Sequence, residues 1–339
     1  MRVAVFGATG QAGTAMRQVL VERSFPLDEV RFFASARSAG RTLPWADGLV
    51  EVEEASPRAD YRGIDLALLA MGGAASRAVA PVLAEAGAIV IDNSSAWRMD
   101  PRVPLVVPEV NRSALDDVPL GIVANPNCTT AVAMPPLEAL RAAAGLRRVT
   151  SSSYQAVSGA GREGVDELTE QVVKLGERAP KLVFGTEGMD LPSGHRFVEP
   201  IAYNVVPVAG ALVDRETEEE HKFRNESRKI LRIPDLPVSC TCVRVPVYTG
   251  HCHSLNVELE RHLDLDEASR VLSRAPGVQL VEVPTPQRAA GKDASLVGRL
   301  RVDPTVEHGL ALFVAGDNLR KGAALNAVQI AEELLPRFR

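Results

Sequence analysis

The sequence predicts an α/β protein with two parts, a doubly wound parallel sheet at the N-terminus and an α+β domain after it. Short apolar runs alternate with helical stretches over the first hundred residues, and a glycine-rich turn joins the first run to the first helical stretch. Longer strand-like segments follow residue 128. Alternating strands and helices are typical of a parallel sheet with helices on both faces.

The length and composition of the chain allow two hydrophobic cores. The 339 residues are 46% hydrophobic, with no secretory leader and no run of about 18 apolar residues. Four cysteines are too few for a disulfide framework, and a net charge of -5 argues against a general nucleic-acid surface. We therefore expect a cytoplasmic protein without structural disulfides and without a membrane or nucleic-acid partner.

The first part contains four predicted strands and two predicted helices. The strands are 1–6, 30–34, 66–70 and 88–91, and the helices are 14–23 and 75–86. In the second part we expect an antiparallel sheet with strands 149–157, 240–248, 253–260 and 296–302. Helices 163–176 and 217–231 interrupt it, and the second is highly charged and expected to be solvated along one face. Helix 321–335 has one apolar stripe and should return to the first part. The predicted domains are 1–127 with 319–339, and 128–318.

Glycines at positions 7, 10 and 13 fall between the first strand and the first helix. There they allow the backbone to approach a pyrophosphate at the positive end of the helix, which is typical of a Rossmann-type dinucleotide site. Glycine turns also occur for packing alone. Gly72 follows another strand, and we expect the backbone there to approach the dinucleotide closely as well.

The end of the second strand distinguishes NADP from NAD. An acidic residue there would bind the ribose 2′-hydroxyl of NAD, but this chain has Ser35, Arg37 and Ser38. An arginine between two hydroxyls suits a 2′-phosphate, so the sequence favours NADP. The alternative is that Arg37 lies in a solvated loop.

Cys128 follows a stiff Asn-Pro-Asn turn and precedes small residues and a helix that we expect Met134, Pro135 and Pro136 to open. A helix N-terminus favours a thiolate and stabilises an oxyanion beside it, so Cys128 is a candidate nucleophile. The alternative is an inert core cysteine.

A thiolate beside a nicotinamide adds to an acyl carbon, and hydride is then exchanged with the adduct. This chemistry needs a histidine for proton transfer, and of six histidines His251 is the best candidate, because it follows Gly250 on a turn after a predicted strand. The alternative is a metal site. Alternation along the strand places Cys240 and Cys242 on one face. The other three candidate ligands, His251, Cys252 and His253, lie at the turn, and this arrangement disfavours a metal site.

Four charged residues are candidates for binding an anionic substrate. Arg98 follows a strand, and Arg244 lies within one, where burial would demand an anionic partner. Glu219 and Lys222 share a helix face, although an exposed ion pair is the simpler interpretation of these two.

The chain resembles the bacterial type of aspartate-semialdehyde dehydrogenase from end to end. The segments that carry the resemblance are GATGQAG at 7–13, SARS at 35–38, DNSSAWRMD at 92–100, VPLVVPEVN at 103–111, NPNCTT at 125–130, YQAVSGAGREG at 154–164, NESRKIL at 225–231, RVPVYTGH at 244–251 and DNLRKGAALNAVQIAEE at 317–333. The resemblance implies a Rossmann-type domain followed by a catalytic and dimerisation domain of the glyceraldehyde-phosphate-dehydrogenase type.

The resemblance also assigns roles. It implies that Cys128 is the nucleophile, His251 the acid/base and Gln155 a positioning group, while the substrate-binding residues are Arg98, Asn127, Gln155, Glu219, Lys222 and Arg244. It reverses our interpretation of Glu219 and Lys222 as an exposed pair. The residues implied to contact NADP are Gly7, Thr9, Gly10, Gln11, Ala12, Gly13, Ser35, Arg37, Ser38, Gly72, Ser158, Gly159, Gly161 and Asn318.

The implied reaction is the NADPH-dependent reductive dephosphorylation of L-aspartyl 4-phosphate to L-aspartate 4-semialdehyde. The resemblance places it on the way to lysine (through diaminopimelate), threonine, methionine and isoleucine, and implies a homodimer that sometimes pairs into a tetramer. The alternatives are N-acetyl-glutamyl-phosphate reductase, a glyceraldehyde-phosphate dehydrogenase, or a catalytically silent paralogue. Arg244 with Glu219 and Lys222 disfavours the two enzymes.

Overall fold

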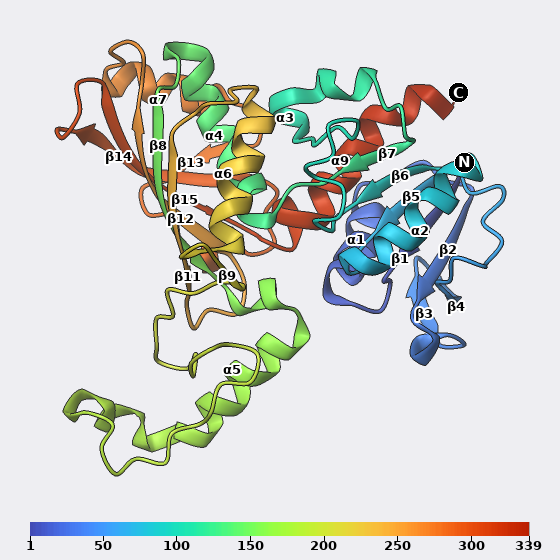
Figure 1. The fold of residues 1–339 in the computed structure, drawn as a ribbon, viewed down its shortest axis with the longest axis horizontal. Helices are drawn as coiled ribbons and strands as arrows, with labels where there is room; N and C mark the ends of the chain where they lie inside the picture. Colours follow the sequence, from blue (N-terminus) through green and yellow to red (C-terminus); the bar gives the residue numbers. More distant parts are fainter. Residues whose placement is uncertain (339) are drawn as a thin grey trace.

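A seven-stranded sheet forms the N-terminal half of the computed structural model, which describes residues 1–338 (Figure 1). All neighbouring strands are parallel except the hairpin β3–β4, so the predicted parallel sheet is confirmed with one antiparallel addition at its edge. The strands, in the order β3-β4-β2-β1-β5-β6-β7, are β1 (Arg2–Phe6), β2 (Glu29–Ala34), β3 (Thr42–Trp45), β4 (Gly48–Glu54), β5 (Leu66–Leu69), β6 (Ile89–Asp92) and β7 (Ile122–Ala124).

Helices cover both faces of this sheet. Alternate residues of its central strand point to opposite sides, and both sets are apolar and pack against helices. Val3 and Val5 of β1 belong to the cluster with α1 (Gln11–Glu22) and α9 (Leu325–Leu334). Ala4 and Phe6 face the other way, into the cluster with α2 (Gly73–Glu85). The predicted return of the C-terminal helix is therefore confirmed. Arg339, the last residue of the predicted range 319–339, lies outside the described residues.

A six-stranded sheet forms the second half, in the order β11-β8-β12-β15-β14-β13. Its strands are β8 (Arg148–Gln155), β11 (Val238–Arg244), β12 (His251–Glu258), β13 (Val278–Leu280), β14 (Ser295–Asp303) and β15 (Gly309–Gly316). The prediction of an antiparallel sheet is wrong at both edges, where β11 pairs with β8 and β13 pairs with β14 in parallel. Helical connections explain this, because a parallel pair needs a long crossover and helices lie between the strands of both pairs.

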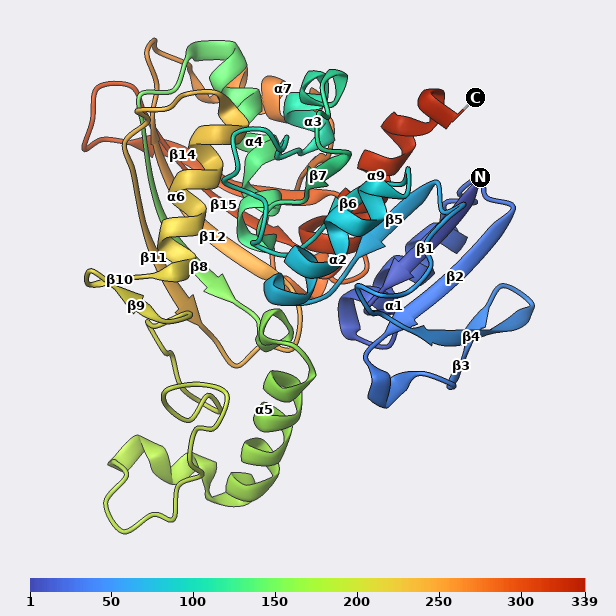
Figure 2. The ribbon, with the colours of Figure 1, turned by 45° about the vertical axis from the view of Figure 1, so that its right-hand side comes forward.

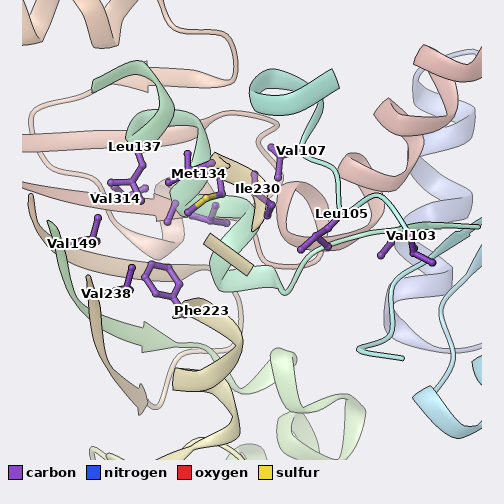
Figure 3. Close-up of a cluster of buried hydrophobic side chains, with 14 of the residues drawn as sticks. Val103, Leu105, Val107, Met134, Leu137, Val149, Phe223, Ile230, Val238 and Val314 are labelled. Carbon is purple, nitrogen blue, oxygen red and sulfur yellow. The ribbon is translucent and has the colours of Figure 1, made fainter. Parts of the chain in front are cut away.

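Three helices cover one face of the second sheet and build its core (Figures 2 and 3). They are α4 (Cys128–Ala144), α6 (Glu218–Leu231) and α7 (Leu265–Arg274). Met134 of α4 and Phe223 of α6 are fully buried in this core, as is Val314 of β15. The remaining short elements are η1 (Ala36–Ser38), α3 (Pro108–Asn111), η2 (Arg112–Asp116), η3 (Val157–Ala160), η4 (Gly176–Phe184), β9 (Leu212–Val213), β10 (Glu216–Thr217), α8 (Pro286–Ala289), η5 (Arg320–Ala324) and η6 (Leu335–Phe338).

An arm projects from the second half. It consists of α5 (Arg162–Leu175), η4 and the following loop, and it carries a small apolar cluster of its own. Figures 1 and 2 show α5 beginning near the junction of the two halves and running away from it. Val183 and Phe184 near the tip of the arm are 82% and 92% exposed.

Two boundaries near the predicted nucleophile differ from the sequence prediction. Helix α4 begins at Cys128, with Pro135 and Pro136 inside it. Prolines disfavour a helix interior, but here the burial of almost every residue from 129 to 137 outweighs that cost. Strand β11 ends at Arg244, and His251 is the first residue of β12 rather than part of a turn. Gly250, at φ +92°, makes the bend just before it.

Within residues 1–338, no helix is long and apolar enough to cross a membrane. All four cysteines are free thiols, as the sequence predicts.

Candidate active site

Cys128 is the first residue of α4, and the preceding Asn127 caps the helix. The side-chain oxygen of Asn127 accepts the Thr129 N–H at 3.0 Å, which fixes the first turn. Cys128 Sγ lies 3.1 Å from Nε2 of His251. The nucleophile and the histidine that the sequence singles out therefore meet, although 123 residues separate them in the chain.

The hydrogen bonds of His251 fix the position of its proton. The Ala156 N–H donates to Nδ1 of His251 at 3.0 Å, so Nδ1 is an acceptor. The neutral ring then carries its hydrogen on Nε2, the atom that faces Cys128 Sγ. Burial, with the charge of Arg244 and the neighbouring His253, lowers the pKa of His251 well below its ordinary value. His251 is consequently neutral and donates towards the sulfur.

The protonation state of Cys128 follows from competing influences. Burial and the carboxylate of Glu219 raise the pKa of the Cys128 thiol to about 11, against the opposing effects of Arg244, Arg98 and the Thr129 N–H. The predicted position at a helix N-terminus is confirmed, but its stabilisation of the thiolate is outweighed in the free protein. The thiol is therefore the predominant form of Cys128 near neutral pH in the free protein.

A tight contact lies behind Cys128. A Cβ on Gly322 would come within 2.8 Å of Cys128 Cβ, so only glycine fits there. Gly322 belongs to η5, a single π-helical turn. The neighbouring Lys321 is fully buried, and its ammonium donates to Glu109 at 2.5 Å and to two side-chain amide oxygens, those of Asn326 and Gln329. The C-terminal segment is thereby locked against the cysteine.

Glu219, Lys222 and Arg244 converge beside Cys128 on a cavity of about 490 Å³. Lys222 Nζ lies 2.8 Å from Glu219, and the Asn127 amide donates to the other oxygen of Glu219 at 3.0 Å. Glu219 is only 8% exposed, so the alternative of an exposed ion pair is wrong. Burial favours the neutral form of Glu219, but Lys222, Arg244 and the Asn127 amide outweigh it and lower the pKa of the carboxyl.

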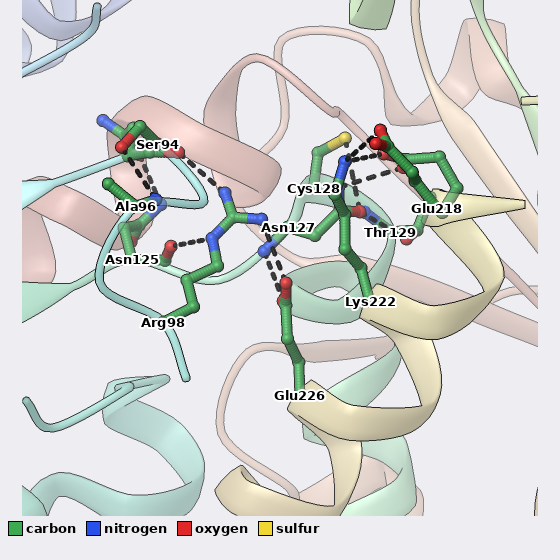
Figure 4. A network of polar contacts seen from close by, with 12 residues as sticks. Ser94, Ala96, Arg98, Asn125, Asn127, Cys128, Thr129, Glu218, Lys222 and Glu226 are labelled. Carbon is green, nitrogen blue, oxygen red and sulfur yellow. Dashed lines mark hydrogen bonds and ion pairs between the residues drawn. The ribbon is translucent and has the colours of Figure 1, made fainter. Parts of the chain in front are cut away.

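Arg98 lies on the other side of Cys128, in a polar network shown in Figure 4. Its guanidinium pairs with Glu226 at 3.0 Å and donates to the backbone carbonyls of Asn125 at 2.9 Å and Asn93 at 2.7 Å. Arg98 is 7% exposed and lines a cavity of about 310 Å³ together with Cys128. It lies apart from Arg244, which lines the larger cavity.

Glu226 is a site residue that sequence reasoning missed. Its second oxygen accepts the Asn127 backbone N–H at 2.6 Å, so one buried carboxylate joins Arg98 to the cap of α4. One turn further on, Lys229 donates to three backbone carbonyls between residues 98 and 103. Positions 219, 222, 226 and 229 share one helix face. That spacing is the signal that could have identified this side of α6 as buried.

Gln155 ends β8 and is fully buried. Its amide nitrogen donates to Ser153 at 3.0 Å, and among the described residues its oxygen has no hydrogen-bond partner. The register places Gln155 beside Arg244 of β11, on the sheet face that carries His251. The Gln155 side chain makes no hydrogen bond to Cys128 Sγ.

The glycine turn fits a dinucleotide. A Cβ on Gly7 would meet the Ala70 carbonyl oxygen, and one on Gly13 would meet the Gly7 carbonyl oxygen, each at 2.2 Å, so the tight turn requires both glycines. Gln11 is the first residue of α1, and its side-chain oxygen is buried without a partner within residues 1–338. Gly72 is the N-cap of α2, with open space in front of it.

One cavity joins several of the predicted cofactor residues to Cys128. The walls of the 310 Å³ cavity come from both halves of the chain and include Gln11, Ala12, Arg98, Asn127, Cys128, Ser158, Gly159, Gly161 and Asn318. Asn318 is buried, accepts the Gly250 N–H at 2.8 Å and donates to Ser158 at 2.9 Å. Thr9 and Gly10 line a neighbouring cavity. Ser35, Arg37 and Ser38 lie further away, at the 3₁₀ turn after β2, where Arg37 is exposed.

Within residues 1–338, His253 and the other three thiols form no cluster that could hold a metal ion. Cys240 and Cys242 share one side of β11, as predicted, with their sulfurs 3.7 Å apart. His253 contacts the Thr129 carbonyl at 3.1 Å through Nε2 and the Ser151 hydroxyl at 3.0 Å through Nδ1. It supports the first turn of α4.

Comparison with known proteins gives the family. The model "Semialdehyde dehydrogenase, NAD binding domain" matches residues 2–118, and "Semialdehyde dehydrogenase, dimerisation domain" matches residues 137–321. Aspartate-semialdehyde dehydrogenase of Streptomyces akiyoshiensis is 57% identical over 335 residues, 98% of each chain. The enzyme of Corynebacterium glutamicum is 54% identical over 340 residues, 98% of this chain and 99% of its own.

The fold agrees with solved structures. Aspartate semialdehyde dehydrogenase II of Vibrio cholerae, complexed with ASA, superposes with a TM-score of 0.92 at 40% identity, covering 100% of this chain and 99% of its own. A probable aspartate-semialdehyde dehydrogenase of Pseudomonas aeruginosa gives 0.91 at 31% identity, with the same coverage. The paired thiol and imidazole, the glycine turn and these full-length matches show that the chain belongs to the aspartate-semialdehyde dehydrogenase family.

Proposed function

We propose that the chain reduces L-aspartyl 4-phosphate to L-aspartate 4-semialdehyde and phosphate with NADPH, through a thioester on Cys128. One observation carries this proposal. Cys128 Sγ lies 3.1 Å from His251 Nε2 in a cavity that the glycine-turn helix also lines, with the charged groups of Glu219, Lys222 and Arg244 beside it. This step supplies the aspartate-derived branch of amino-acid synthesis that leads to lysine, threonine, methionine and isoleucine.

In the proposed reaction, the Cys128 thiol passes its proton to the departing phosphate as Sγ forms a C–S bond with the acyl carbon and the C–O bond to phosphate breaks. Bound NADPH supplies the hydride that reduces the thioester. The C–S bond then breaks, which releases the aldehyde and restores the thiolate. Gln155, fully buried at the end of β8, is proposed to help position the acyl group.

We assign His251 the role of donor at the sulfur and at the oxygen that becomes anionic. Its Nε2–H faces Cys128 Sγ, because the Ala156 N–H occupies Nδ1. A hydrogen bond from Nε2 stabilises the thiolate before attack and the oxyanion afterwards. His251 does not act as a base in this state, because Nε2 of the neutral ring carries a hydrogen and has no free lone pair.

The charged residues divide the substrate between them in this proposal. Arg244 binds the α-carboxylate and Glu219 binds the amino group, since both line the larger cavity. Lys222, Arg98 and Asn127 hold the phosphate. Three contacts already restrain the Arg98 guanidinium, which leaves two of its five N–H groups for the substrate.

The protein is proposed to act as a homodimer, with the second sheet in the interface. The sheet face opposite α4, α6 and α7 carries polar and aromatic side chains that are at least partly exposed; these are Thr150, Ser152, Tyr154, Ser254, Asn256 and Phe313. The exposed apolar tip of the arm is a second surface for another copy of this chain. By the family resemblance, two dimers pair into a tetramer and the protein is cytoplasmic.

The test is the reverse reaction of the purified protein. Reduction of NADP, followed by absorbance, should require both aspartate semialdehyde and phosphate or arsenate. Cys128→Ser should retain NADPH binding but lose turnover, because an alkoxide is scarcely available near neutral pH. Faster turnover of N-acetyl-glutamate semialdehyde would favour the alternative reductase, and NADPH binding without turnover of either aldehyde would favour a silent paralogue.

A further inference from the structure

A cavity of about 330 Å³ lies over the glycine turn and has walls from both halves of the chain. From the first half come Thr9, Gly10 and residues of α1, whose N-terminus starts at Gln11. From the second half comes Arg162, the first residue of α5. The N-termini of two long helices therefore open onto the same space, and each favours an anion.

Arg162 is the one charged residue in the wall of this cavity, as far as the described residues define it. The others are Thr9, Gly10, Gln11, Thr14, Ala15, Gln18 and Leu319. The glycine turn itself contains no cation. A pyrophosphate bound there would meet backbone N–H groups from the first half, and the arginine in the same cavity wall comes from the second half.

The surroundings of Arg162 leave it available. Its side chain is 85% exposed, and its ion pair with Asp166, one turn along α5, is 3.5 Å long between two solvated groups. Such a pair contributes little to stability, so exchanging it for a phosphate oxygen costs little. Arg98, by contrast, is buried and held by Glu226.

We propose that Arg162 is an affinity-determining contact for the dinucleotide, binding its pyrophosphate across the junction between the two halves. This inference rests on the proposed NADPH-dependent function. The two arginines then have different roles. Arg37, at the 3₁₀ turn after β2, binds the 2′-phosphate that NADP carries and NAD lacks. Arg162 binds the charge that NADP and NAD share.

The experiment compares three ligands by fluorescence titration of the full-length protein. They are NADPH, NADH and adenosine 2′-monophosphate, which carries the 2′-phosphate but has no phosphate at the 5′ position. Arg162→Gln should raise the Kd of NADPH and NADH by the same factor, about tenfold, and leave that of the monophosphate unchanged. The Kd increase should shrink at high salt.

Two variants serve as controls. Arg178→Gln removes an arginine beyond the end of α5, away from the cavity, and should change none of the three affinities. Asp166→Asn removes the competing carboxylate and should leave NADPH binding as tight or tighter. An unchanged NADPH affinity in Arg162→Gln, a loss confined to NADPH, or an equal loss for all three ligands would each overturn the assignment. Failure of the wild-type protein to bind NADPH would instead reject the proposed function.

Discussion

Glu226 and Arg98 form a buried ion pair that fastens α6 to the loop after β6. Their side chains are 2% and 8% exposed, and 3.0 Å separates Glu226 Oε1 from Arg98 Nη1. The other Glu226 oxygen holds the Asn127 N–H. A single carboxylate thus spans the distance between the proposed phosphate-binding arginine and the cap of the catalytic helix.

Glu226→Leu should lower the free energy of unfolding by about 3 to 5 kcal/mol, because it leaves Arg98 buried without its partner. Chemical denaturation of this variant, of Arg98→Leu and of the double variant measures the effect. The double variant should lose clearly less than the sum of the two single losses. A loss below about 1 kcal/mol for Glu226→Leu would contradict the importance of this pair.

Arg37→Ala should raise the Kd of NADPH at least tenfold and leave that of NADH nearly unchanged, because the removed contact is available only to the 2′-phosphate. Arg41→Ala, which removes an exposed arginine a few residues further on, is the matched control. Titration of both cofactors decides the matter, and equal losses would show that Arg37 does not distinguish them.

Arg244→Leu should raise the KM for aspartate semialdehyde by roughly ten- to a hundredfold with little change in the KM for phosphate. The reason is that Arg244 is assigned to the α-carboxylate. Arg196→Leu removes a more exposed arginine from the same cavity wall and should have a smaller effect. Steady-state titration of each substrate in turn tests the assignment, which fails if phosphate is affected as strongly as the aldehyde.

Gly322→Ala should lower kcat by tenfold or more while the protein still folds, because the new methyl group would lie 2.8 Å from Cys128 Cβ and push the nucleophile out of place. Gly48→Ala is the control, since its Cβ would have only ordinary contacts. Circular dichroism monitors the fold. Full activity of Gly322→Ala would mean that the site tolerates a shift of Cys128.

The stability of the protein should fall as the pH drops from about 6.5 to about 4. Burial lowers the pKa of His253 to about 4, so the folded state keeps the ring neutral while the unfolded chain binds a proton near pH 6.5. Protons therefore favour the unfolded state in this window. Since one pKa unit corresponds to about 1.4 kcal/mol, His253 contributes at most about 3 kcal/mol to the loss.

The variant His253→Gln should flatten this pH dependence, and His195→Gln, at an exposed position, should not. His251 contributes in the same direction, because its pKa is also lowered. Unfolding free energies measured between pH 4 and 7.5 provide the comparison. If the unfolding free energy of His253→Gln changes with pH as steeply as that of the wild type, His253 does not cause the pH dependence.

Sequence reasoning succeeded where local rules decide the structure. The spacing of the glycines at 7, 10 and 13 predicts the tight turn between β1 and α1, and the alternation of strands and helices predicts the parallel sheet. Reasoning failed where distant contacts decide. Glu226 looks like one charge among many on a polar helix, and its burial depends on Arg98 and Asn127, 128 and 99 residues away. Likewise, Pro135 and Pro136 argue against a helix that tertiary packing imposes.

The contact of Gly322 with Cys128 also determines when the protein can first become active. The wall behind the nucleophile consists of residues that the ribosome adds long after the nucleophile itself. At about 5 to 20 residues per second, roughly 10 to 40 s separate the synthesis of the two. During that interval the second sheet is still incomplete, and Lys321 has not yet anchored η5 to Glu109. An organised thiol site therefore appears only when translation is nearly finished, so a nascent or prematurely terminated chain carries its cysteine without the means to use it.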